Sequence, residues 1–227
     1  MLANKNVDDS FEKKQHLLHL TRPIPIEKLT SKYFYILKLL MKKELPTSQA
    51  NILSKLNETE LNWRDIYLNA RKCTVDNYGR TFHFKTIHNF LYLNEALSKM
   101  ENHEAFKSSP LCSYCKERNE TIIHLFAECK ITKVLWNRLN QKISIDLPAL
   151  TPKSAYCGFF ENRSMIINHI LLIFKIALFK NRDSGACSLT YITNKILQIK
   201  ETEENIVYIN PNAKRKNNEK WARLEIA

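Results

Sequence analysis

The chain has 227 residues, 44% of them hydrophobic, so it can bury a core and is not a wholly disordered protein. Its three glycines are too few for a hairpin-rich fold or for glycine-rich phosphate-binding loops. The 35 Lys and Arg residues exceed the 23 Asp and Glu residues, which gives a formal net charge of +12. We therefore expect a mainly α fold whose field attracts polyanions, most commonly nucleic acid, although a basic surface without any partner explains the charge equally well.

The first helical region is expected at residues 29–109. Before it, residues 1–28 mix charges and carry Pro23 and Pro25, which predicts a loosely ordered lead-in. Within 29–109, apolar side chains recur at helical spacing in successive segments, each opened by a residue that favours helix N-termini. These segments begin near Thr30, Thr47, Thr59 and Thr74, and Pro46 ends the first of them.

Part of this region combines basic residues with interleaved aromatic residues. The basic ones are Arg71, Lys72, Arg80, His83, Lys85 and His88. Such rings and cations can contact bases and backbone of a nucleic acid. The alternative, which the sequence favours, is that the rings belong to the core and the cations to a solvated face.

Residues 110–143 carry the pattern Cys112-x2-Cys115-x8-His124-x4-Cys129. A Cys-x2-Cys pair places two sulfurs on one metal ion from a tight turn, and three thiolates with one imidazole complete the closed tetrahedron of a structural zinc site. A closed shell leaves no position for water or substrate, so the pattern predicts structural Zn²⁺ rather than a catalytic metal. The alternative is three free cysteines and an unrelated histidine.

The segment around His124 reads as helix, and residues 130–143 form an amphipathic helix behind it. His124 and Cys129 are five residues apart, which is about 140° round an ideal helix. They cannot both face one metal ion from a straight helix, so we expect the helix to end or tighten near residues 128–130.

Prolines at 148 and 152 mark residues 144–163 as a linker. Residues 164–200 are expected to be helical, and their stretch from Met165 to Phe179 is too short and too polar to span a membrane, so it predicts a buried helix. Residues 201–227 are expected to be a charged basic tail that contains Lys214-Arg215-Lys216. The sequence favours a solvated end, and the alternative is a short basic arm on nucleic acid.

The other cysteines, Cys73, Cys157 and Cys187, lack metal-binding neighbours and are expected to be buried small hydrophobes. Three clustered cysteines suit a metal site in a reducing, intracellular compartment better than a disulfide framework. The polar N-terminus shows no signal peptide. Cytoplasm and nucleus remain equal alternatives.

One stretch resembles a known family. The segment Leu111-Cys-Ser-Tyr-Cys-Lys-Glu-Arg-Asn-Glu-Thr-Ile-Ile-His-Leu-Phe-Ala-Glu-Cys, followed by Trp136, is similar to the zinc-binding domain after the reverse transcriptase of LINE-type (non-LTR) retrotransposons. That pattern is Cys-x2-Cys, Glu-Thr-x2-His-Leu-Phe, Cys and then Trp, and every position is in register in this chain. The resemblance covers about residues 30–200, but only the zinc core is specific.

The resemblance does not bring an enzyme with it. A reverse transcriptase palm needs a Tyr/Phe-x-Asp-Asp turn that binds two metal ions, whereas the one Asp-Asp pair, Asp8-Asp9, follows Asn6-Val7. A restriction-like nuclease needs a Pro-Asp and spaced carboxylates, but only Asp146 and Asp183 follow Cys129 as aspartates. We therefore expect a non-catalytic protein.

The resemblance implies a zinc-binding module that holds RNA or DNA by weakly sequence-specific backbone contacts. The cations expected to make these contacts are Lys116, Arg118, Lys130, Lys133, Arg138 and Lys142. The alternative is a zinc-stapled helical protein that binds another protein, or a structural remnant without nucleic-acid binding. Cations gathered on one face favour the first reading, and cations spread evenly favour the second.

Overall fold

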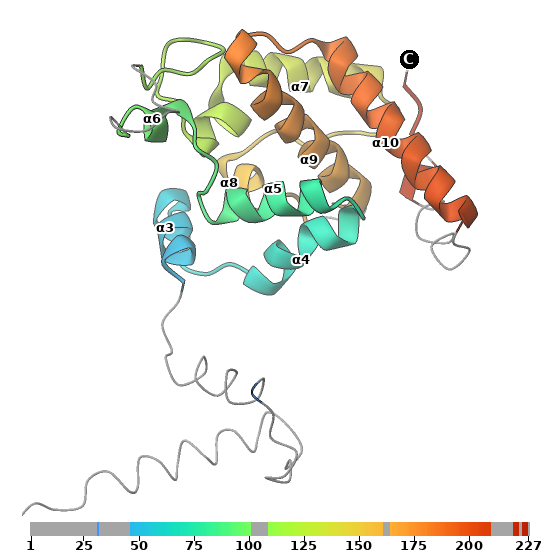
Figure 1. Cartoon of the computed structure of the whole chain (residues 1–227), viewed down its shortest axis with the longest axis horizontal. Coiled ribbons are helices and arrows are strands. Elements are labelled where there is room, and N and C mark those ends of the chain that lie inside the picture. Colours follow the sequence, from blue (N-terminus) through green and yellow to red (C-terminus); the bar gives the residue numbers. More distant parts are fainter. Residues whose placement is uncertain are drawn as a thin grey trace, which may run out of the picture. The chain divides into compact units, whose positions relative to one another are not determined.

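Figure 1 shows the computed structural model of the chain, which describes residues 31, 46–100, 109–160, 164–209, 220–222 and 224–226. The chain divides into two units, 1–46 and 47–227, and helices α3 to α10 all belong to the second unit. The predicted lead-in 1–28 lies outside the described residues. So does the predicted helix from Thr30 to Met41, apart from Ser31.

The second unit is mainly helical, which confirms the predicted fold class. In the described part of the chain, strand-like pairing is limited to two isolated bridges, Leu111 with Asn119 and Ile143 with Ile226. The elements are α3 (Thr47–Leu56), α4 (Trp63–Cys73), α5 (Asn77–Ile87), α6 (Asn94–Leu97), the π-helix η2 (His124–Glu128), α7 (Lys130–Lys142), α8 (Pro152–Tyr156), α9 (Ser164–Asn181), the 3-10 turn η3 (Arg182–Ser184) and α10 (Leu189–Ile209).

Helix α9 is the centre of the fold. It packs against α4, α5 and α10, and Figure 1 shows it running between α5 and α10. The side chains from Ile170 to Lys175 are all buried, so the helix is covered on every side, as its nearly continuous apolar sequence predicts. The predicted buried helix at 164–180 is confirmed.

Side-chain caps set where several helices begin. The Asn62 side chain accepts a hydrogen bond from the Asp65 amide and starts α4. Asp76 accepts from two amides and starts α5, while Thr151 forms a reciprocal capping box with Ser154 at the start of α8. These contacts satisfy amides that have no partner inside their own helix.

Two predicted segment boundaries are wrong. Residues 144–163 are not a plain linker, because α8 lies within them and Ala155 and Tyr156 belong to the core. Residues 201–227 are not a tail throughout, because α10 continues to Ile209 and Trp221 and Leu224 are buried. In both cases short apolar groups within polar sequence find a place in the core. Lys214-Arg215-Lys216 lies outside the described residues.

A buried polar network ties the C-terminal segment to the helices. Lys220 Nζ donates to the Cys73 carbonyl at 2.8 Å and to the carboxylate of Glu203 on α10. Trp221 Nε1 donates to the same carboxylate at 2.8 Å. The His169 side chain of α9 lies 3.1 Å from Lys220 Nζ, and burial lowers its pKa. Lys220 and Trp221 are therefore part of the folded unit.

Candidate metal centre

The Cys112–Cys115 turn forms a compact loop that presents two sulfurs on one side. The Lys116 amide donates to the Cys112 carbonyl at 3.0 Å, and the Cys112 amide donates to the Arg118 carbonyl at 2.8 Å. Lys116 has a φ of +58°, a left-handed conformation that turns the chain back after Cys115. The Leu111–Asn119 bridge closes the loop at its base.

From His124 to Cys129 the chain forms a turn that is wider than a turn of an α-helix. Thr121 caps it, because its Oγ1 accepts from the His124 amide at 3.0 Å. The Cys129 amide donates to the His124 carbonyl at 2.7 Å, a bond from residue i+5 to residue i that characterises a π turn. The wider turn stacks Cys129 over His124. The helix ends at Cys129, as expected, but it does not tighten.

The four side chains come together as the sequence predicts. Their ligand atoms lie within 4.8 Å of one another. Cys112 Sγ and Cys129 Sγ are 3.9 Å apart, and Cys115 Sγ lies 3.2 Å from His124 Nε2. With Zn–S bonds of about 2.3 Å, two sulfurs of a zinc tetrahedron lie about 3.8 Å apart. The donor set and its spacing therefore fit a metal ion held by three thiolates and one imidazole.

Burial and electrostatics also suit a metal ion. Cys112, Cys129 and His124 are buried, and Cys115 is half-buried. The hydrogen bond from Cys112 and the first amides of α7 lower the pKa of Cys129, which favours the thiolate that binds metals. His124 Nδ1 is buried and has no hydrogen-bond partner in the described part of the chain, which leaves Nε2 as the nitrogen that faces the sulfurs.

Glu120 supports the turn from behind, a role that the sequence alone did not reveal. Its carboxylate is fully buried and accepts from the Ser113 amide at 2.7 Å and from the Asn94 amide at 3.2 Å. Asn94 Nδ2 in turn donates to the Leu111 carbonyl at 2.9 Å. The carboxylate thus joins the metal-binding turn to α6. The available signal was the acidic residue four positions before the histidine, within the Glu-Thr-x2-His motif.

The module is anchored on α9. Tyr114 Oη, from the middle of the Cys112–Cys115 turn, donates to the Leu178 carbonyl at 2.7 Å. Trp136 of α7 packs edge-on against Phe174 at a ring distance of 4.9 Å. Phe126, next to the histidine ligand, is fully buried. The metal centre is therefore built into the main core and is not an appended finger.

All six cations predicted to bind nucleic acid are exposed. Lys130 pairs with Glu117, and Arg118 pairs with Glu128 at 3.4 Å, so two of the six are partly neutralised. The cations of α7 recur at spacings of three to five residues on its exposed face, and the helix contains no acidic residue. Other exposed cations lie elsewhere on the second unit, on α3, α4, α5, α8 and α9 and just after α6. They are Lys55, Arg64, Arg71, Lys72, Lys85, Lys99, Lys153 and Lys180.

In the basic and aromatic stretch, the prediction that the rings belong to the core holds for Phe82 and fails for Phe84 and Phe90. Phe82 and His83 are buried, and burial lowers the pKa of His83 to about 4 while its Nε2 lies 2.8 Å from the Ile66 carbonyl. Phe84 and Phe90, in contrast, are about half exposed. The structure thus splits the stretch into a core part and a surface part.

Two of the three remaining cysteines, Cys73 and Cys157, are buried as expected, and Cys187 is half-buried rather than fully buried. All three are free. Burial raises the pKa of Cys73 to about 12 and that of Cys157 to about 11, which keeps both thiols protonated and unreactive.

No protein-family model, no curated protein and no solved structure matches the chain. Among the helices that the structure describes, none combines the length and the apolar character needed to cross a membrane.

Proposed function

We propose that this chain is a non-catalytic nucleic-acid-binding module with one structural zinc ion, held by Cys112, Cys115, His124 and Cys129, and that its basic helix α7 contacts the phosphates of RNA or DNA. The observation that carries the proposal is that the candidate metal centre is joined directly to the basic helix α7. Cys129 is both the last candidate ligand and the residue before the first turn of α7. Metal binding at Cys129 would therefore fix the position of the basic helix.

Zinc is the metal that the donor set favours. Three thiolates and one imidazole with no carboxylate select zinc over magnesium or calcium, which prefer oxygen. When bound, the ion would cross-link the Cys112–Cys115 turn to the π turn. Structural zinc sites in small modules contribute about 10 kcal/mol or more, which is comparable to the stability of a domain.

The charge of α7 supports a polyanion as partner. The helix carries four cations and no carboxylate, and Lys133 and Arg138 make no ion pair within the described residues. The first turn of a helix also carries a partial positive charge, which adds to the attraction of Lys130 and Lys133 for phosphate. Contacts to phosphates carry no sequence information, so binding would be weakly sequence-specific and strongly dependent on salt.

The first experiment measures zinc by elemental analysis in the purified chain and in Cys115→Ser, with Cys187→Ser as the control. We expect one zinc ion per chain in the wild type and in the control, and a loss of zinc in Cys115→Ser. Absence of zinc from the wild type, prepared under reducing and chelator-free conditions, would overturn the metal assignment.

The second experiment measures the salt dependence of binding to RNA and DNA duplexes. Replacing Lys133 and Arg138 by Gln should reduce the slope of log K against log salt by about two, because two phosphate contacts are lost. The matched control replaces Lys55 and Arg64, exposed cations of α3 and α4, and should leave the slope unchanged. If both double variants changed the salt slope equally, the binding would lie outside α7. If the wild type bound neither RNA nor DNA, the protein-binding alternative would be favoured.

A further inference from the structure

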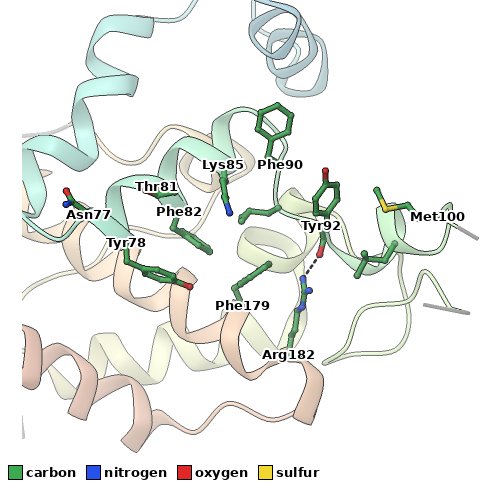
Figure 2. A pocket seen from close by; sticks show the side chains of 12 residues that line it. Asn77, Tyr78, Thr81, Phe82, Lys85, Phe90, Tyr92, Met100, Phe179 and Arg182 are labelled. Atoms are coloured by element: carbon green, nitrogen blue, oxygen red, sulfur yellow. Dashed lines mark hydrogen bonds between the residues drawn. The ribbon is translucent and has the colours of Figure 1, made fainter. Parts of the chain in front are cut away.

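A second surface feature lies away from the metal centre. A cavity of about 490 Å³ opens between α5, the segment 90–100 and the end of α9 (Figure 2). Its size suits a small organic group such as a nucleotide. Its lining includes Tyr78, Lys85, Phe90, Tyr92, Phe179 and Arg182.

The lining is aromatic and cationic. Tyr78, Phe90 and Tyr92 are 47%, 55% and 51% exposed, so large ring surfaces face the solvent around one cavity. Lys85 and Arg182 are the charged residues of the lining, and no carboxylate is among the lining residues. A ligand that covers the rings and carries negative charge fits this lining, because exposed apolar patches around a cavity mark binding sites and none of the described lining residues compensates the positive charge.

One of the two lining cations, Arg182, is held beside a ring. The Arg182 guanidinium lies 4.2 Å from the centre of the Phe179 ring and donates to the Tyr92 carbonyl at 2.8 Å, as the dashed line in Figure 2 shows. Because these contacts fix the Arg182 guanidinium before a ligand arrives, less freedom of that group is lost when a ligand binds.

The rings continue beyond the cavity. The rings of Phe90 and His88 are stacked, 5.9 Å apart with planes 22° from parallel, and the Phe84 ring lies 4.2 Å from that of His88. Phe84 and Phe90 are both about half exposed. A run of planar groups therefore leads away from the cavity along the end of α5.

We propose that this cavity and the rings beside it, together the aromatic site, bind unpaired bases of a single-stranded RNA or DNA. The bases would stack on Phe90 and Tyr92, and Lys85 and Arg182 would contact the adjoining phosphates. The aromatic site rests on the proposed function, since it gives the same nucleic acid a second point of contact. A base-paired duplex does not fit, because its bases are already stacked within the helix and do not reach side-chain rings.

The site also has a polar neighbour on the side of the metal module. Arg182 borders a second cavity, of about 330 Å³, whose lining includes Lys116 of the zinc-binding turn. Asp183 lies in the same lining, so this cavity is less cationic than the aromatic site. A strand whose base occupies the aromatic site would have a phosphate path over Arg182 toward Lys116.

The test compares three labelled ligands by fluorescence anisotropy on the full-length, zinc-loaded chain. They are single-stranded RNA and single-stranded DNA of about 12 nucleotides, a length within the range of known single-strand sites, and a DNA duplex of the same sequence. The variants are Phe90→Ala and Tyr92→Ala, whose exposed rings can be removed without opening the core. The control is Phe160→Ala, which removes a ring that is 50% exposed and lies outside the cavity lining.

We expect each aromatic-site variant to weaken single-strand binding by about fivefold to a hundredfold, the effect of losing one stacked base, and to leave duplex binding unchanged. Phe160→Ala should bind all three ligands as the wild type does. Single-strand affinities that stay within twofold in both variants would overturn the aromatic site while leaving the proposed function intact. A wild type that binds none of the ligands would overturn both.

Discussion

Lys175 offers a sharp test of the packing at the centre of the fold. It lies on α9, is 2% exposed, and its Nζ donates to the Ala155 carbonyl at 2.9 Å. Burial lowers its pKa from 10.5 to about 8. A difference of that size corresponds to a destabilisation of about 3 kcal/mol at neutral pH, where the lysine is charged in both the folded and the unfolded chain.

The sign of the pH dependence follows from this difference. Because the folded-state pKa is lower than the unfolded one, the unfolded chain binds the proton more readily between pH 8 and 10.5. The free energy of unfolding contributed by Lys175 therefore rises with pH across that window. From pH 7 to pH 9.5 the increase amounts to about 2 kcal/mol.

Replacing Lys175 by Met removes the titration while keeping a long side chain in the core. At pH 7 the substitution removes the buried charge, which raises the free energy of unfolding by about 3 kcal/mol. It also leaves the Ala155 carbonyl without a donor, which lowers the free energy of unfolding by about 1–3 kcal/mol. We expect Lys175→Met to range from equal stability to about 2 kcal/mol more stable at pH 7, and this difference should fall by about 2 kcal/mol at pH 9.5.

The assay is urea unfolding followed by circular dichroism at both pH values with zinc present. Lys180→Met, which changes an exposed lysine of the same helix, serves as the control and should show no such dependence. A difference between wild type and Lys175→Met that is the same at pH 7 and pH 9.5 would refute the reasoning.

Three further substitutions test separate parts of the structure. Glu120→Gln weakens the support behind the zinc-binding turn and should lower zinc affinity by about tenfold to a hundredfold in a chelator competition; an unchanged affinity would remove Glu120 from that role. Lys220→Met removes a donor to the buried carboxylate of Glu203 and should lower the free energy of unfolding by about 3–5 kcal/mol in chemical denaturation. A decrease under about 1 kcal/mol would mean that Lys220 does not form this buried network. Gly158→Ala places a Cβ 2.5 Å from Asn168 Oδ1 at a φ of +87° and should cost about 2–4 kcal/mol, seen as a lower Tm; an unchanged Tm would contradict that crowding.

The cluster of three cysteines and one histidine could be predicted from sequence because its information is local. The Cys-x2-Cys spacing and the histidine and cysteine that follow restrict the geometry within 18 residues. The same local information showed that a straight helix cannot present both His124 and Cys129, but it did not show how the chain would respond. Widening into a π turn depends on the start of α7 and on the core behind it, which no short window contains.

The predictions that failed depend on contacts between distant residues. Trp221 lies in a polar, charged segment, so its sequence neighbours indicate a solvated end, yet Glu203 of α10 accepts a hydrogen bond from its indole nitrogen. The aromatic residues near position 90 show the reverse error. Their spacing is compatible with a core helix, but α5 ends at Ile87 and leaves Phe90 on the surface. Hydrophobic pattern alone cannot decide which apolar side chains a tertiary fold will cover.

The buried network around Lys220 also has a consequence for the order in which the chain folds. Its bond to the Cys73 carbonyl joins residues 147 positions apart. Contacts over such distances close late, because the intervening chain must be ordered first. A nascent chain can form its individual helices as they are synthesised, but it cannot complete this network until residue 220 has been made. Chains that lack Lys220 and Trp221 could not close this network and would keep part of the core open to proteases.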